Sequence, residues 1–106
     1  MVDIKILNTK EEYENFINED KVVVKFSAEW CSPCKVLGNI INKLDSEQLN
    51  GYRFGEVNVD DDFADEITRN LNIRNIPVCI YFNNGKEVNR TIGVVKADDI
   101  YKNVSI

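Results

Sequence analysis

Apolar residues recur along the chain at two different spacings, and each spacing predicts a different secondary structure. Short runs rich in β-branched and aromatic residues are typical of strands, whereas apolar residues three and four positions apart form one face of a helix. On this basis we predict strands at residues 3–7, 21–26, 52–59, 78–82 and 87–92. Helices are predicted within residues 9–17, 33–44, 63–71 and 96–104. The resulting order, βαβαβαββα, is typical of an α/β domain whose mixed sheet carries helices on both faces.

Short signals mark where several of these elements begin. Thr9, with Glu12 three residues later, is a capping box for the first helix. Asp62 can cap the third helix. Asn84 followed by Gly85 is a strong hairpin signal between the last two strands. The second predicted strand, KVVVKF, is mostly apolar, which indicates a strand covered on both faces.

Length and composition indicate one folded domain. A chain of 106 residues supports one hydrophobic core, and we expect a single domain spanning residues 1–106. Shares of 43% apolar and 29% charged residues are those of a globular protein. The net charge of -5 repels phosphate backbones and anionic lipids, so neither nucleic acid nor a membrane surface is an expected partner.

The sequence also predicts a cellular location. Its longest apolar run, at residues 78–82, is far shorter than the roughly 18 residues that indicate a membrane-spanning helix. Residues 1–5 lack the charged-then-apolar order of a signal peptide, so we expect a cytoplasmic protein. An exported precursor whose leader has been removed stays open as the alternative. Three cysteines, an odd number, argue against a secreted disulfide scaffold.

Two of the cysteines, Cys31 and Cys34, fall at the turn from the second strand to the second helix. A disulfide that closes a four-residue ring contributes only about 2 kcal/mol to stability, so a structural bridge is poorly placed here. Pro33 suits the first turn of a helix, and the unpaired N–H groups there lower the pKa of a cysteine thiol. We therefore expect Cys31, at the exposed amino end of the helix, to be a nucleophile. Cys34, one turn later, can attack a mixed disulfide formed at Cys31.

A zinc site is the competing interpretation of the cysteine pair. Zinc requires four nitrogen or sulfur ligands, but the chain has no histidine and its third cysteine, Cys79, lies in a predicted strand. We therefore predict no metal site. Cys79 is expected to be a small buried apolar residue, with a regulatory thiol as the alternative.

Three segments, in the same order, resemble the thioredoxin family. They are AEWCSPCK at residues 28–35, IRNIPV at 73–78 and FNNGKEV at 82–88, beside that family's AEWCGPCK, IRGIPT and FKNGE. The resemblance covers essentially the whole chain. It implies the thioredoxin fold, an α/β domain with a central mixed five-stranded sheet flanked by four helices. It also implies a cis Pro77 facing the cysteines, and a groove that Gly93 completes.

The resemblance further implies an activity, which is reduction of protein disulfides by a monomer without a bound cofactor. Electrons would come from an NADPH-dependent flavoprotein, a thioredoxin reductase. The residues expected to bind the substrate are Trp30, Ser32, Pro33, Val59, Ile76, Pro77, Ile92, Gly93 and Val94. For Trp30, ordinary core packing is the alternative.

Several positions depart from the family pattern. Ser32 replaces a glycine in the dipeptide between the cysteines, which tunes the reduction potential through local hydrogen bonding and backbone freedom. Lys25 stands where the family has a buried aspartate, and Glu56 where it has a lysine, so we expect a facing Lys25–Glu56 pair with exchanged charges. We hypothesise that Glu56 takes over proton transfer to and from Cys34 while Lys25 holds it. In the alternative, Lys25 extends its ammonium group to water. Asn39, preceded by Gly38, replaces a mid-helix proline.

Two other functions are compatible with the same residues. The cysteines could donate a disulfide, as an oxidase or isomerase does in an exported compartment. Alternatively, the groove of Trp30, Pro77 and Gly93 could dock a partner without catalysis. The reduction potential distinguishes the first alternative, and loss of turnover without both cysteines distinguishes the second.

Overall fold

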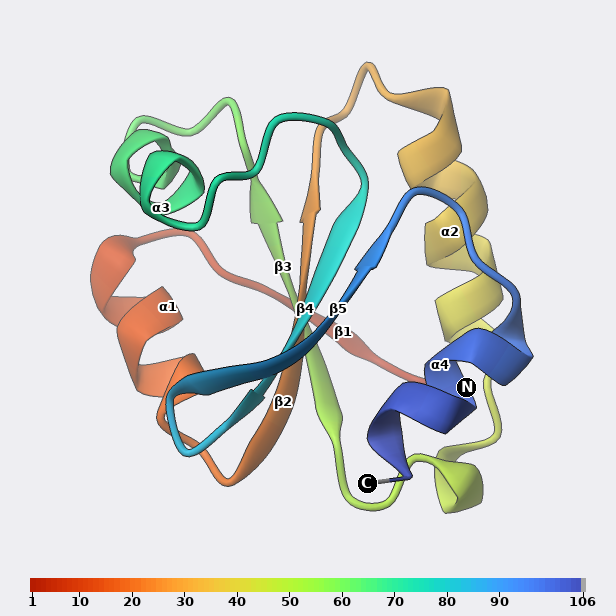
Figure 1. Ribbon diagram of the computed structural model, residues 1–106. Helices are drawn as coiled ribbons and strands as arrows, with labels where there is room; N and C mark the ends of the chain where they lie inside the picture. Colours follow the sequence, from red (N-terminus) through yellow and green to blue (C-terminus); the bar gives the residue numbers. More distant parts are fainter. Residues whose placement is uncertain (106) are drawn as a thin grey trace.

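The computed structural model describes residues 1–105, and Ile106, the last residue of the predicted domain, lies outside them. Within residues 1–105 the chain forms five strands and four α-helices, as predicted (Figure 1). The strands are β1 (Ile4–Ile6), β2 (Lys21–Ser27), β3 (Arg53–Asn58), β4 (Val78–Asn83) and β5 (Lys86–Ile92). The helices are α1 (Lys10–Ile17), α2 (Ser32–Asn42), α3 (Ala64–Asn70) and α4 (Ala97–Val104).

The strands form one mixed sheet in the order β1-β3-β2-β4-β5. β1 and β2 both pair with β3 in parallel, whereas β4 pairs antiparallel with β2 and with β5. The mixed sheet predicted from the order of elements is therefore confirmed. Because β2 and β3 are parallel neighbours, their carboxyl ends meet at one edge of the sheet. The backbone N–H of Val59 donates to the carbonyl of Ser27 at 2.8 Å, and so joins the segments that leave these two strands.

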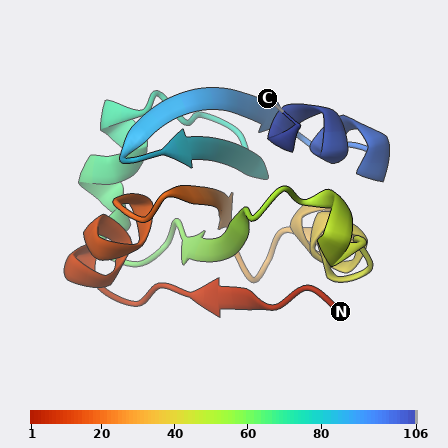
Figure 2. The same cartoon turned by 90° about the horizontal axis from the view of Figure 1, so that it is seen from below.

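Helices cover both faces of the sheet: α1 and α3 lie on one face, and α2 and α4 on the other (Figure 2). Each face has its own apolar cluster. Phe16 and Ile67 belong to the cluster under α1 and α3, and Leu37 and Ile100 to the cluster under α2 and α4. β2 runs between the two layers with residues 22–27 buried, which confirms the prediction of a strand covered on both faces.

The pleat of β2 decides which of its side chains face the cysteine-bearing helix. Val22 and Val24 pack in the cluster under α1 and α3, whereas Val23 packs in the cluster under α2 and α4. Since side chains alternate along a strand, Lys25 points to the same face as Val23. Lys25 is paired in register with Glu56 of β3 on one side and with Cys79 of β4 on the other.

The hairpin signal is confirmed, whereas the predicted capping box at Thr9 forms only one of its two expected hydrogen bonds. Both Asn84 and Gly85 have positive φ angles, 50° and 85°, as the predicted hairpin requires. The Thr9 hydroxyl accepts from the N–H of Glu12 at 3.1 Å, but the Glu12 carboxylate accepts from Asn8, one residue before the expected donor. The pattern gave no indication of the short 3₁₀ helix at Ser46–Gln48.

The prediction that the Asp62 side chain caps the third helix is wrong. α3 begins at Ala64, and Phe63 occupies the cap position. The backbone carbonyls of Asp61 and Asp62 accept from the N–H groups of Ala64 and Asp65, at 3.0 and 3.3 Å. A turn formed by the backbone itself thus leads into the helix and takes the place of a side-chain cap.

Candidate active site

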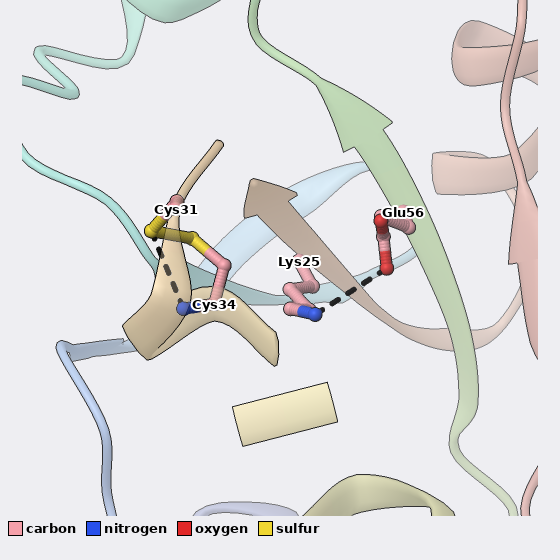
Figure 3. Close-up of polar contacts among 4 residues, drawn as sticks. All are labelled: Lys25, Cys31, Cys34 and Glu56. Carbon is pink, nitrogen blue, oxygen red and sulfur yellow. Dashed lines mark hydrogen bonds and ion pairs between the residues drawn. A yellow bond between two sulfur atoms is a disulfide. The ribbon is translucent and has the colours of Figure 1, made fainter. Parts of the chain in front are cut away.

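Cys31 and Cys34 are joined by a disulfide at the amino end of α2 (Figure 3). Cys31 has an extended backbone conformation and occupies the cap position, while Pro33 lies in the first turn. The N–H of Cys34 donates to Sγ of Cys31 at 3.3 Å, so this sulfur takes the place that a serine or aspartate oxygen takes at an ordinary cap. The predicted strand-to-helix placement of the pair is confirmed.

The cysteines are less exposed than expected. Cys31 is 4% exposed and Cys34 is 1% exposed, because Ala28, Val59 and Ile76 pack around them. Each cysteine nevertheless lines a surface hollow, and the two hollows differ. The two buried cysteines therefore border different parts of the surface.

The outer hollow, about 490 Å³, contains Cys31. Its lining includes Trp30, Ser32, Pro33 and Ile76, four of the predicted substrate-binding residues. A smaller neighbouring hollow of about 270 Å³ is lined by Trp30, Ile76 and also Val59. These five residues thus surround the face of the disulfide that is open on the side of Cys31.

The remaining predicted substrate residues lie along the end of the β4–β5 hairpin. The Ile76–Pro77 peptide bond is cis, as the family resemblance implies. The N–H of Gly93 donates to the Pro77 carbonyl at 2.8 Å, which fixes these two backbones together. Ile92 is 66% exposed and lines a further hollow beyond Ile76. Val94 is also exposed but lies outside the residues that line these hollows.

Trp30 is 70% exposed, so the alternative of ordinary core packing does not describe it. Its indole N–H donates to the Asp60 carboxylate at 2.8 Å, and the Asn58 side chain accepts from the N–H of Asp60 at 3.0 Å. Sequence reasoning missed Asp60 as a partner of Trp30. A signal was present, because Asp60 follows β3 and Trp30 follows β2, and those strand ends meet at one edge of the sheet.

Arg74 and Asn75 were also missed by sequence reasoning. Both line the outer hollow beside Cys31, and Arg74 also lines the two hollows next to it. They belong to the IRNIPV segment that supports the resemblance, in which Ile76 and Pro77 are the predicted substrate-binding residues. Arg74 places a positive charge next to the apolar surface around Trp30.

On the inner side, Cys34 lines a hollow of about 640 Å³ together with Lys25 and Glu56. Nζ of Lys25 lies 3.4 Å from Oε1 of Glu56, so the expected facing pair is present (Figure 3). The Lys25 side chain is 4% exposed and that of Glu56 is 27% exposed. Lys25 therefore does not extend to water, and Glu56 is the member of the pair that solvent reaches.

Cys79 is buried and free, as expected from its position in a strand. Burial raises the pKa of its thiol to about 12, although the nearby charge of Lys25 acts in the opposite direction. A thiol of such low acidity is a poor nucleophile at neutral pH. This residue behaves as a small apolar core residue.

Within residues 1–105, no group of three or more histidine, cysteine, aspartate or glutamate side chains is arranged to hold a metal ion. None of the helices in that range is both long enough and apolar enough to cross a bilayer.

Comparison with known proteins places this site in a family. The sequence profile of thioredoxin matches residues 4–105. The chain belongs to the thioredoxin family. A thioredoxin of Mycoplasmoides gallisepticum is 36% identical over 98 residues, which cover 92% of this chain and 95% of that protein. A thioredoxin of Chlamydia caviae is 33% identical over 99 residues, 93% of each chain.

Solved thioredoxin structures share the architecture. The solution structure of oxidised thioredoxin from Plasmodium falciparum has a TM-score of 0.82 at 28% identity, covering 97% of this chain and all of that one. Thioredoxin from Malassezia sympodialis has a TM-score of 0.85 at 24% identity, covering 100% and 94%, which supports the fold alone. Family membership and the disulfide-forming Cys31–Cys34 pair make this chain a thiol-disulfide oxidoreductase of the thioredoxin type.

Proposed function

We propose that the chain reduces disulfide bonds of other proteins by dithiol-disulfide exchange, with Cys31 as the nucleophile and Cys34 as the resolving thiol. The observation that carries this proposal is the separation of the two cysteines between two hollows. Cys31 lines the outer hollow with Trp30, whereas Cys34 lines the inner one with Lys25 and Glu56. A protein disulfide that docks against Trp30 meets Cys31 first.

The exchange proceeds in two steps. The Cys31 thiolate attacks one sulfur of the substrate disulfide, so that a mixed disulfide forms and the other substrate sulfur leaves as a thiolate. Cys34 then attacks Sγ of Cys31, the Cys31–Cys34 bond forms, and the second substrate sulfur leaves. Two electrons pass from the dithiol to the substrate, whose sulfurs take up two protons. In the reduced form, the N–H of Cys34 that contacts Cys31 stabilises the attacking thiolate.

The substrate lies, in this proposal, as an extended segment across the cis-proline side of the site. Trp30, Val59, Ile76, Ile92 and Val94 contact its side chains. Pro77 and Gly93, whose backbones are hydrogen-bonded to each other, form the floor. Pro33 starts the helix that presents Cys31, and Ser32 influences the reduction potential through its position between the cysteines.

Glu56 and Lys25 serve the resolving step. Glu56 accepts the proton of the Cys34 thiol through water in the inner hollow, which both residues line. Lys25 holds the carboxylate in place through the contact of 3.4 Å. The family's buried aspartate is thus replaced by a carboxylate from the neighbouring strand.

The remaining parts of the cycle follow from family membership. A thioredoxin reductase, an NADPH-dependent flavoprotein, would reduce the Cys31–Cys34 disulfide after each turnover. The exchange moves electrons between sulfur atoms, so we expect neither a metal nor a bound cofactor to take part. We expect a monomer that works in the cytoplasm, where reductants can regenerate the dithiol.

Trapping the intermediate tests the assignment of roles. With dithiothreitol as reductant and a disulfide-bonded reporter protein, Cys34→Ser should accumulate a covalent adduct at Cys31, whereas Cys31→Ser should form none and show no turnover. Mass spectrometry identifies the adduct. An adduct at Cys34 instead would reverse the roles. Full function in the Cys31→Ser/Cys34→Ser variant would indicate a docking module, and an equilibrium with glutathione that strongly favours the dithiol would indicate a disulfide donor.

The role of Glu56 has its own test. Glu56→Gln removes the proton acceptor but keeps the shape of the side chain, so resolution of the mixed disulfide should slow about tenfold or more at neutral pH. The deficit should shrink at high pH, where Cys34 is already ionised. Stopped-flow rates across pH measure this. Glu29→Gln, an exposed carboxylate that lines the same hollow, is the matched control. A rate profile identical to that of the unaltered protein would remove Glu56 from the mechanism.

A further inference from the structure

Lys25 occupies an unusual position for a charged side chain. It lies on the central strand β2, only 4% of the residue is exposed, and its ammonium group has neighbours on two sides. On one side is the Glu56 carboxylate, 3.4 Å away. On the other side is Gly38 of α2, where an added Cβ would lie 3.0 Å from Nζ of Lys25. The ammonium group is therefore held between the helix and Glu56.

This position lies close to the resolving cysteine. Cys34 and Gly38 are four residues apart in α2, so they lie on the same face of the helix, one turn from each other. A turn of helix rises about 5.4 Å, which puts the ammonium group within roughly one turn of Cys34. In Figure 3, Lys25 lies between Cys34 and Glu56. The buried positive charge therefore lies about one helical turn from the resolving cysteine.

Other charged groups also face this region. Glu29, Lys35 and Asp61 line the inner hollow with Cys34, and Cys79 of β4 is paired in register with Lys25. Glu29 and Lys35 are exposed and Asp61 is partly exposed, so water and ions screen their charges. Cys79 is a neutral thiol, since burial raises its pKa to about 12. Lys25 is the charge that solvent screens least.

We infer that the Lys25 ammonium group acts as a fixed positive charge on the sheet side of Cys34 that stabilises its thiolate, and that Gly38 is the positioning residue that makes room for it. This inference rests on the proposed role of Cys34 as the resolving thiol, and it gives Lys25 a second task besides holding Glu56. In resolution, the thiolate so stabilised attacks Sγ of Cys31, and the substrate sulfur leaves. A positive charge here favours the ionised thiol, which is the opposite of what a buried aspartate does.

Gly38 supports the inference because glycine is a poor residue inside a helix. Its φ angle is not in the left-handed region, so the backbone at this position would accept other residues. A Cβ here would lie 3.0 Å from Nζ of Lys25, a contact tight enough that the ammonium group would have to shift by a few tenths of an ångström. The contact to Lys25 therefore explains a glycine that the helix alone would not favour.

The test measures ionisation of Cys34 at equilibrium, separately from catalysis. In a Cys31→Ser background, the ultraviolet absorbance of the thiolate reports Cys34, while Cys79 titrates only near its pKa of about 12. Lys25→Met/Glu56→Gln removes both charges together, so neither is left unpaired. We expect the proton dissociation constant of Cys34 to fall by up to about tenfold in this variant, because the lost positive charge lies within roughly one helical turn of Cys34, whereas the Glu56 carboxylate is partly exposed and better screened by water.

Two further variants separate charge from structure. Lys35→Met removes an equal positive charge from the rim of the same hollow, and should leave the Cys34 titration nearly unchanged. Gly38→Ala requires the ammonium group to shift by a few tenths of an ångström, and should lower the dissociation constant as the double variant does, by a smaller factor. If Gly38 had only a structural role, this variant would change stability but not the titration. Circular dichroism checks that each variant is folded.

The outcomes distinguish this inference from the proposed function. An unchanged Cys34 titration in the folded Lys25→Met/Glu56→Gln variant, or an increased dissociation constant, would overturn the role of Lys25. Reduction of a reporter protein by the unaltered chain would still support disulfide reduction in that case. If the unaltered chain showed no turnover while the Cys34 titration shifted as expected in the Lys25→Met/Glu56→Gln variant, the proposed disulfide reduction would be overturned. The effect of Lys25 on Cys34 would still be established.

Discussion

At the scale of single residues, two buried polar side chains face each other across β2 and β4. Lys25 carries a charge that Glu56 balances, whereas Cys79, its neighbour in register, stays neutral because burial raises its pKa from 9.0 to about 12. A charged group is tolerated in this core only where a partner of opposite charge accompanies it. Lys25 avoids an unpaired buried charge by pairing with Glu56, and Cys79 avoids one by staying protonated.

The raised pKa of Cys79 predicts loss of stability in alkali. A group that binds its proton more tightly in the folded state contributes stability below its unfolded pKa, and that contribution is lost as pH rises toward the folded value. For Cys79 the window runs from pH 9.0 to about 12. Cys79→Val, which keeps a small apolar side chain, should reduce the fall in free energy of unfolding across this window. Urea unfolding at a series of pH values measures the difference.

Other residues limit the size of that effect. Burial also raises the pKa of Tyr13 to about 12 and that of Tyr81 still further, so Cys79→Val should remove only part of the alkaline slope. The oxidised protein is the form to use, because Cys31 and Cys34 do not titrate while they are joined. A slope as steep in the variant as in the unaltered protein would show that Cys79 titrates with an ordinary pKa.

How far single residues could be predicted depended on how local their partners are. The Lys25–Glu56 pair followed from the family resemblance, in which both positions carry charges, together with the period of two along neighbouring strands. The hydrogen bond from Trp30 to Asp60 joins two loops, and the contact of Lys25 with Gly38 joins a strand to a helix. Neither has a periodic signal in the sequence. The strand ends indicate only that Trp30 and Asp60 lie near each other, and the hydrogen bond itself, like the position of Lys25 beside Gly38, needed coordinates.

At the scale of elements, α2 combines presentation of the cysteines with accommodation of the buried lysine. It runs unbroken from Ser32 to Asn42. Asn39 stands where the family has a mid-helix proline, and Gly38 comes directly before it. Glycine costs a helix about 1 kcal/mol relative to alanine. The helix therefore gives up stability at the position that touches Lys25.

A coupling between Gly38 and Lys25 should be measurable as stability. In a Lys25→Val/Glu56→Gln background, the shorter valine leaves the space beside the helix free, and Gly38→Ala should stabilise the protein by about 1 kcal/mol. In the unaltered protein the gain should be smaller, because the new methyl group meets Nζ of Lys25 at 3.0 Å. Denaturant unfolding of the four proteins gives the coupling energy.

Asn39→Ala provides the control for this cycle. Asn39 is exposed in the same helix, so its replacement should change stability by the same amount in both backgrounds. An equal gain from Gly38→Ala with and without Lys25 would show that the contact has no energetic consequence.

Most elements were predictable because their patterns are local. Within residues 1–105, strand and helix periodicity gave the five strands and the four α-helices but not the 3₁₀ helix, and Asn84 with Gly85 gave the hairpin. The predicted cap of α3 was wrong because three consecutive aspartates offer several cap positions. A backbone turn at Asp61 and Asp62 leads into the helix instead of a side-chain cap. The cis bond before Pro77 followed from family resemblance alone, since nothing in a local pattern distinguishes the two isomers.

At the scale of the whole molecule, the disulfide adds a covalent bond but restricts the conformations of the unfolded chain only a little. It closes a ring of four residues at one end of α2, and both cysteines already lie in a packed region with Ala28, Val59 and Ile76. The two apolar clusters lie on either side of the sheet and do not depend on this bond. Folding should therefore be largely independent of the redox state, as the proposed cycling between the dithiol and the disulfide requires.

The free energy of unfolding should accordingly differ only modestly between the two redox forms. Loop-closure entropy for a four-residue ring gives about 2 kcal/mol in favour of the oxidised form, against nearly 5 for a ring of about 100 residues. Because folding and disulfide formation are linked, this difference equals the change in the redox equilibrium of the pair between the folded and unfolded chains. Guanidinium unfolding of the oxidised protein and of the protein in dithiothreitol measures it. Cys34→Ser should give the same value with and without dithiothreitol, and so controls for the reductant. If the reduced form were as stable as the oxidised one, the folded protein would stabilise the dithiol by as much free energy as ring closure contributes to the oxidised form. Replacing Lys25 would then be the first test of where that stabilisation comes from.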